Sequence, residues 1–204
     1  MTRSIDLGRV RFSKKYLLLS SVYLSSIAGI ITGAIMRNNI SLTSEISVLG
    51  LFSDFLQVDF TRSKFSAFMM GATINFIFFL LVFVFGLSVC GGFFIYILNY
   101  FKGLGIGFTV GIICKTFGAK GIIISLLSVF PQSVLFIICL AYFSTEALRS
   151  SFTLVNIFTK GNLYKKEIPL PGQILKKGMY LFSITLAGVL YEVFLARFFM
   201  MILL

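Results

Sequence analysis

The sequence contains no histidine, and only 7 of its 204 residues are acidic. The lack of histidine excludes histidine metal sites, Ser-His catalytic triads and imidazole proton relays. Cysteine is also scarce: Cys90, Cys114 and Cys139 lie far apart in apolar surroundings. This placement predicts free thiols that pack as small apolar side chains, rather than a disulfide framework or a zinc site.

Charged residues make up 12% of the chain, about half the share found in an average soluble protein. Hydrophobic residues make up 58%, and the mean hydropathy is +1.00. Several uncharged stretches are long enough to cross a bilayer as helices. The composition therefore predicts an all-α, polytopic membrane bundle that forms one domain over residues 1–204, without a separate soluble domain.

Five membrane spans follow from the apolar stretches. The first stretch, residues 16–36, is free of charge and covers about 31 Å as a helix. It is longer than a signal-peptide core and lacks a cleavage site, so we expect it to be retained. The five predicted spans are residues 16–36, 65–87, 88–114, 121–143 and 179–204.

Two of these spans contain residues that disturb a helix. Asn99, Lys102 and several glycines interrupt the third span, so a single tilted helix and a broken or re-entrant helix both fit the pattern. Pro131 lies in the middle of the fourth span. There it should kink the helix and leave a backbone carbonyl one turn earlier without its amide partner.

Two further segments, residues 41–60 and 145–160, have patterns typical of helices that lie in the membrane interface. In the first segment, apolar residues fall on one face, although a loop with scattered apolar residues is the alternative. In the second, apolar residues recur at helical spacing from Leu148 to Phe158. The proline-rich run at residues 168–172 then ends that pattern.

Basic residues are distributed unevenly between the two sides that five crossings define. One side holds Arg3, Arg9, Arg11, Lys14, Lys15, Arg149, Lys160, Lys165, Lys166, Lys176 and Lys177. The other side holds Arg37, Arg62, Lys64, Lys115 and Lys120. This asymmetry predicts a cytoplasmic N-terminus and an external C-terminus. The net charge of +11 fits cytoplasmic loops and contact with anionic lipids better than nucleic-acid binding.

Polar side chains inside the spans are candidates for function, because they are costly to place in lipid. Lys102 and Glu192 each lie near the middle of a span, and we hypothesise that they pair between helices or share a small polar cavity. In the alternative, Lys102 extends toward one interface and Glu192 pairs with Arg197. We expect Asn75 and Gln132 to hydrogen-bond neighbouring helices, a structural role that we favour over one in transport.

Glycines recur at four-residue spacing in two spans, as Gly29 and Gly33 in the first and Gly103, Gly107 and Gly111 in the third. Stacked glycines flatten a helix face and let another backbone approach closely, which predicts helix packing and is compatible with a homodimer. The sequence shows no nucleophile motif and no aspartate pair within a span. We therefore expect neither enzymatic activity nor a cofactor.

Two motifs in the middle of the chain resemble a known family. The runs NYFKGLGIGFTVG at residues 99–111 and SVFPQ at residues 128–132 are similar to the stage II sporulation protein M family. The Ile168–Pro171 run and Glu192 in a final apolar helix also resemble that family. The resemblance implies a scaffold of the mother-cell septal or engulfing membrane during sporulation. It further implies two partners that degrade peptidoglycan, the stage II sporulation proteins D and P.

Such a scaffold needs an external surface that can hold its partners. We expect the external segment at residues 37–64 to supply it, with contacts from Phe52, Asp54, Phe55 and Asp59. The alternative function is a small transporter or channel that uses Lys102 and Glu192 in a polar cavity within the membrane.

Overall fold

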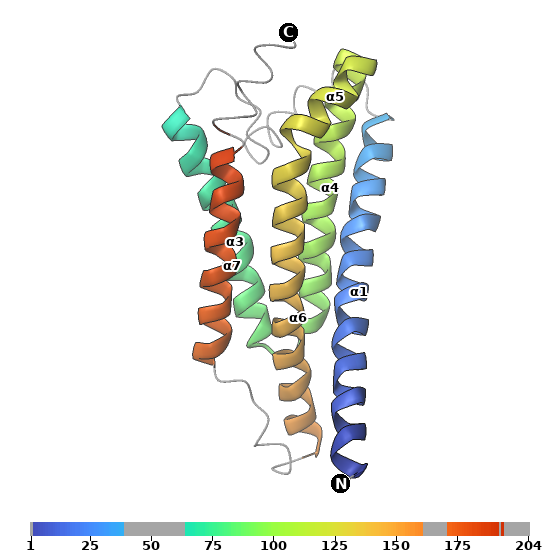
Figure 1. Cartoon of the computed structure of the whole chain (residues 1–204), viewed down its shortest axis with the longest axis vertical. Coiled ribbons are helices and arrows are strands. Elements are labelled where there is room, and N and C mark those ends of the chain that lie inside the picture. The colour runs from blue at the N-terminus through green and yellow to red at the C-terminus, as the bar shows by residue number, and fades with distance from the viewer. Residues whose placement is uncertain (1, 39–63, 161–170, 192, 194–204) are drawn as a thin grey trace.

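The computed structural model describes residues 2–38, 64–160, 171–191 and 193. Apart from short turns these residues are helical, and none of them lies in a strand. Figure 1 shows the bundle that they form. Its helices are α1 (Thr2–Asn38), α3 (Lys64–Gly86), α4 (Gly91–Phe117), α5 (Ala119–Ser128), α6 (Phe130–Lys160) and α7 (Pro171–Tyr191). The predicted all-α fold is confirmed.

Five of the described helices are long and apolar enough to cross a membrane, which confirms the predicted polytopic bundle. Successive spans run in opposite directions, so the start of α1 and the end of α7 lie at opposite ends of the bundle (Figure 1). The spans are Tyr16–Met36, Phe68–Gly86, Gly91–Lys115, Phe130–Ile157 and Gly172–Tyr191.

The third span is one continuous helix. α4 runs from Gly91 to Phe117 without interruption, so the broken or re-entrant alternative does not apply. Its glycines keep the helical backbone conformation. Their missing side chains leave room for a neighbouring helix to approach closely.

The fourth span differs from its predicted range of residues 121–143. The helix bends at Val129, which separates α5 from α6, and the span runs from Phe130 to Ile157. Pro131 therefore lies in the first turn of α6 and not in the middle of the span, a position that suits a residue without an amide hydrogen. Neither glycine nor proline follows Pro131 before Lys160, so nothing ends the helix at residue 143.

Residues 145–160 are the second half of α6 and not a separate interfacial helix. Thr145, Leu148 and Ser151 on its inner face are buried. The Ser151 hydroxyl donates a hydrogen bond to the carbonyl of Ser88 at 2.8 Å and so ties α6 to the turn between α3 and α4. The amphipathic pattern of this segment therefore reflects packing inside the bundle.

The fifth span begins before its predicted start at residue 179. α7 starts at Pro171, which suits a first helical turn, and it continues through Lys176 and Lys177 because their long side chains can extend away from the apolar core. The predicted end of this span at residue 204 and the predicted interfacial segment 41–60 lie outside the described residues.

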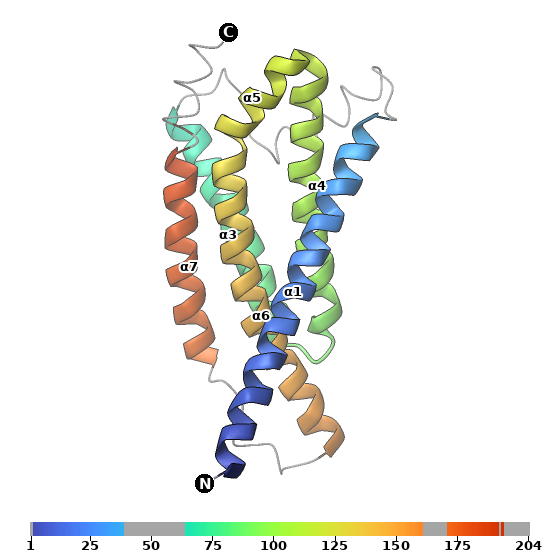
Figure 2. The same cartoon turned by 45° about the vertical axis from the view of Figure 1, so that its right-hand side comes forward.

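α6 is the central helix of the bundle and contacts each of the other described helices. Two views show α1 beside α4, and α3 beside α7 (Figures 1 and 2). Between α3, α6 and α7, the ring of Phe79 packs against the rings of Phe136, Phe143 and Phe182 at centroid distances of 6.0, 5.3 and 5.8 Å. These rings fill the centre of one half of the bundle.

Candidate functional site

α1 and α4 approach each other at the level of their backbones. Gly29 and Gly33 of α1 face α4, and Gly103 and Gly107 of α4 face α1. A Cβ atom built on any of these four glycines would lie within about 3 Å of backbone atoms of the other helix, closer than real Cβ atoms come. Gly111 is partly buried further along α4. The four-residue spacing thus serves packing between two helices of the same chain.

Polar side chains beside the glycines also join α1 to α4. Tyr96 of α4 takes part in two of these contacts: its hydroxyl lies 2.8 Å from the hydroxyl of Ser21, and its carbonyl accepts a hydrogen bond of 2.9 Å from Ser25. One turn further along, the hydroxyls of Thr32 and Tyr100 lie 2.9 Å apart. Hydrogen bonds between helices in a membrane contribute about 0.6–2 kcal/mol each, so these contacts reinforce the close packing.

Lys102 lies near the middle of α4, on a side that faces two aromatic rings. Its Nζ atom is 5.0 Å from the ring centroid of Phe78 on α3 and 4.3 Å from that of Phe136 on α6. Both rings are buried. A cation over an aromatic face is stabilised by about 0.5–2 kcal/mol, more where water is excluded. The lysine therefore connects three helices in the interior of the bundle.

Two asparagines in the spans are buried. Asn99 donates hydrogen bonds of 2.8 Å to the carbonyl of Ile95 on its own helix and to the hydroxyl of Ser144 on α6. Asn75 on α3 is 3% exposed, and its Nδ2 atom has no hydrogen-bond partner among the described residues. Asn99 thus joins α4 to α6, whereas the amide nitrogen of Asn75 is a buried polar group in the interior of the bundle.

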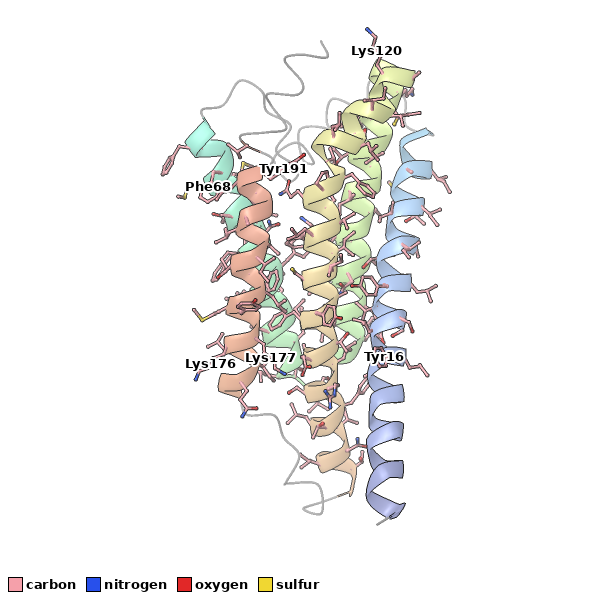
Figure 3. All side chains as sticks on the ribbon, viewed as in Figure 1. Tyr16, Phe68, Lys120, Lys176, Lys177 and Tyr191 are labelled. Atoms are coloured by element: carbon pink, nitrogen blue, oxygen red, sulfur yellow. The ribbon has the colours of Figure 1, made fainter. Side chains whose placement is uncertain are left out.

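The bend before α6 is tied to the end of α7. Pro131 has no amide hydrogen and cannot donate to the carbonyl of Leu127, four residues earlier. The hydroxyl of Tyr191 donates to that carbonyl instead, at 3.3 Å. Figure 3 shows Tyr191 at the end of α7 that adjoins this bend. Gln132 lies next to Gly188 of α7, where a Cβ atom would be 3.5 Å from its Cγ.

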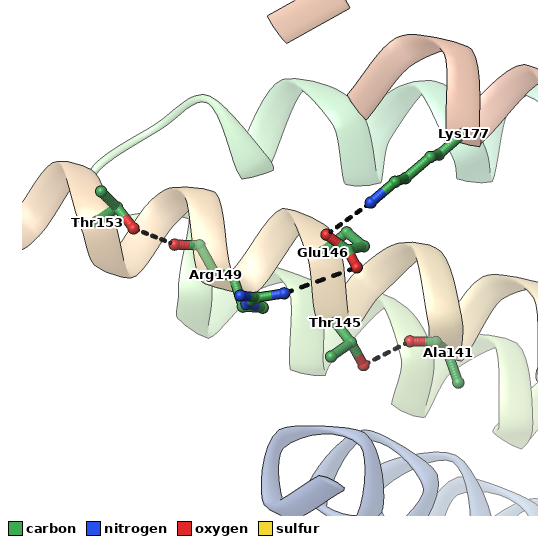
Figure 4. Close-up of polar contacts among 6 residues, drawn as sticks. All are labelled: Ala141, Thr145, Glu146, Arg149, Thr153 and Lys177. Atoms are coloured by element: carbon green, nitrogen blue, oxygen red, sulfur yellow. Dashed lines mark hydrogen bonds and ion pairs between the residues drawn. The ribbon is translucent and has the colours of Figure 1, made fainter. Parts of the chain in front are cut away.

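At the other end of α7, a carboxylate joins two helices. Glu146 of α6 forms ion pairs with Lys177 of α7 at 3.3 Å and with Arg149 of its own helix at 3.8 Å (Figure 4). The side chain of Glu146 is 17% exposed, so it lies close to the surface of the bundle without being fully solvated.

Several predicted residues lie outside the part of the chain that the structure describes. They are Phe52, Asp54, Phe55, Asp59 and Glu192. The proposed pairing of Lys102 with Glu192 therefore stays a prediction. Sequence analysis did not single out Glu146, Ser144 or Tyr191. Only Tyr191 had a usable signal, because the carbonyl left free by a proline needs a donor from elsewhere.

Among residues 2–38, 64–160, 171–191 and 193, no three Cys, Asp or Glu side chains come together in a group that could hold a metal ion. What these residues build is a set of polar and backbone contacts that fix helices to one another. This arrangement defines the chain as a polytopic helical membrane protein.

The sequence model of the family described as stage II sporulation protein M matches residues 20–199. The chain belongs to this family, which confirms the resemblance seen in its central motifs, and it is a sporulation-related membrane protein. No curated protein sequence and no solved structure gives a significant match to the chain.

Proposed function

We propose that the chain is the membrane scaffold that recruits the stage II sporulation proteins D and P and holds them at the septal membrane during engulfment. The family match over residues 20–199 is the observation that carries this proposal. The geometry supports it, because the polar side chains of α1, α4 and α6 bond to neighbouring helices. A bundle held in this way suits a fixed anchor for enzymes that supply the chemistry themselves.

We also propose that the N-terminus is cytoplasmic and the C-terminus external. In the described helices, the end of the bundle at which α1 begins carries Arg3, Arg9, Arg11, Lys14, Lys15, Arg149, Lys160, Lys176 and Lys177. The opposite end carries Arg37, Lys64, Lys115 and Lys120. An excess of basic residues is typical of the cytoplasmic side.

Co-purification from sporulating cells tests the scaffold role. The chain is tagged at its N-terminus, extracted in mild detergent and captured, and the two hydrolases are quantified by mass spectrometry. An unrelated tagged membrane protein of the same stage serves as the control. We expect both hydrolases to be enriched with this chain alone. Their absence, with the bait present at its normal level, would refute the proposal.

A second variant tests the contact surface. Residues 41–60 are replaced by a Gly/Ser linker of the same length, and membrane insertion is checked by protease protection. We expect insertion to be unchanged and both hydrolases to be lost. If the hydrolases remain bound, the contacts lie on the membrane-facing sides of the helices instead.

Flux measurements and a charge swap distinguish the scaffold from the alternative function, a transporter. If Lys102 and Glu192 form a structural pair, Lys102→Glu and Glu192→Lys should each impair engulfment, and the double variant should recover part of it. Flux of solute or ions through purified protein in vesicles, lost in Glu192→Gln, would favour the transporter. A double variant no better than either single variant would refute the pairing.

A further inference from the structure

The described bundle has a basic surface around the start of α7 and the adjoining part of α6, at the end opposite Lys120 (Figure 3). Lys177 lies on the side of α7 that faces α6, and Lys176 lies on the outer side of α7. Arg149 comes from α6, and Lys176 and Lys177 come from α7. All three side chains reach the surface: Lys176 is exposed, and the side chains of Lys177 and Arg149 are 58% and 37% exposed. We call these three residues the α6–α7 basic site.

One carboxylate holds two of these cations in place. Glu146 lies between Lys177 and Arg149, at 3.3 Å and 3.8 Å from their nitrogen atoms (Figure 4). Lys176 pairs with no side chain in the part of the chain that the structure describes. Counting described residues alone, the site carries three positive charges against one negative charge, and an anion would complement it.

The exposed apolar residues beside the lysines indicate which anion this is. Leu175, Met179 and Tyr180 are 47%, 63% and 70% exposed. Met179 and Tyr180 lie three and four residues after Lys176, so they share its side of α7, one turn further into the span that begins at Gly172. Cations next to an exposed apolar face at the start of a span match the headgroup and the acyl chains of a lipid.

We propose that the α6–α7 basic site binds the phosphate of an anionic phospholipid, whose acyl chains lie along Leu175, Met179 and Tyr180. A soluble polyanion would use the charges and leave the apolar face uncovered. The lipid satisfies both parts of the surface. This site is independent of the scaffold proposal, because it uses neither the external segment nor the hydrolases.

Native mass spectrometry of the full-length protein in detergent tests the site, with phosphatidylglycerol or phosphatidylcholine added over a range of concentrations. We expect a clear preference of the wild type for phosphatidylglycerol. Each basic residue near a membrane surface attracts anionic lipid with an energy that corresponds to about a fivefold change in affinity. Lys176→Gln should therefore weaken phosphatidylglycerol binding about fivefold, and Lys176→Gln with Lys177→Gln by about 25-fold.

The matched controls are Lys120→Gln at the opposite end of the bundle and Lys176→Arg at the site, and both should keep wild-type affinity for phosphatidylglycerol. Glu146→Gln should strengthen binding, because it removes the carboxylate that competes with the phosphate for two of the cations. A purely structural role of the ion pairs predicts no such gain.

Three results would overturn the proposal. The first is an unchanged lipid preference in the double lysine variant. The second is an equal loss in Lys120→Gln, which would show a general effect of charge. The third is displacement of phosphatidylglycerol by millimolar inorganic phosphate, which would indicate a site for a free anion. Because none of these outcomes involves the hydrolases, failure here leaves the scaffold test unaffected.

Discussion

The close contact between α1 and α4 predicts that one methyl group can separate two helices. A Cβ atom on Gly107 would lie 2.7 Å from the carbonyl carbon of Ile30 and 2.9 Å from its Cα. Both are backbone atoms and cannot rotate away, so Gly107→Ala must push α1 from α4. Gly92 in the same helix is the matched control, because its Cβ would meet only side-chain atoms, the nearest at 3.6 Å, which is ordinary contact.

The cost of Gly107→Ala follows from two terms. Overpacking a well-filled contact costs about 1–3 kcal/mol. Separation of the helices also weakens the three side-chain contacts between α1 and α4, each worth roughly 0.6 kcal/mol or more. We therefore expect a loss of about 2–4 kcal/mol in the free energy of unfolding. Gly92→Ala should change it by less than about 1 kcal/mol and can raise it, because alanine favours a helix over glycine.

Reversible unfolding of the purified proteins in mixed micelles, with increasing dodecyl sulfate, measures both variants on one scale. Gly103→Ala and Gly33→Ala should behave like Gly107→Ala, because their Cβ atoms would also meet backbone of the other helix. If Gly107→Ala is as stable as Gly92→Ala, the backbone contact between α1 and α4 is refuted.

Three further predictions concern other contacts. Tyr191→Phe should lower the free energy of unfolding by about 1 kcal/mol in the wild type and by less in a Pro131→Ala background, where an amide can occupy the same carbonyl. Equal losses in both backgrounds would refute this coupling. Asn99→Ala should cost about 1–2 kcal/mol, because it removes hydrogen bonds within α4 and to α6. In cells, a membrane-impermeant maleimide should label the exposed Cys90 only after permeabilisation of the membrane. It should not label the buried Cys139 before the protein is unfolded. Labelling of Cys90 in intact cells would reverse the proposed orientation.

Hydropathy and glycine spacing allow much of this fold to be predicted from the sequence. Charges at Lys15 and Arg37 enclose the first apolar stretch, so its limits are visible in the sequence. The spacing of Gly29 and Gly33 shows a flat helix face. It does not show which helix covers that face. A helix of a second copy and another helix of the same chain would fit against it equally well, because both present the same kind of backbone. Only the three-dimensional arrangement identifies α4 as the partner.

The limits of the last two spans were harder to predict for a common physical reason. Glu146 and Arg149 made the second half of α6 look like a separate interfacial helix outside the span, and Lys176 and Lys177 placed the predicted start of the last span at residue 179. In the structure, Glu146 pairs with Arg149 and with Lys177, and long basic side chains reach the surface from a helix that continues. A hydropathy pattern treats each of these charged residues as unfavourable within a membrane span. It cannot include the ion pairs between helices, because one segment of sequence does not show which residues of other helices lie nearby.

The same contacts divide the bundle into parts that differ in how they can move. α1 and α4 touch along their backbones and cannot slide without a clash between main-chain atoms. Lys102 lies on α4 but reaches side chains of α3 and α6, whose aromatic rings can rotate and repack. A partner that altered the surroundings of Lys102 would therefore change the contacts of α4 with α3 and α6 and leave the α1–α4 pair intact. For this reason the charge swap at Lys102 reports on the contacts of α4 with the rest of the bundle, and the glycine variants report on the pair itself.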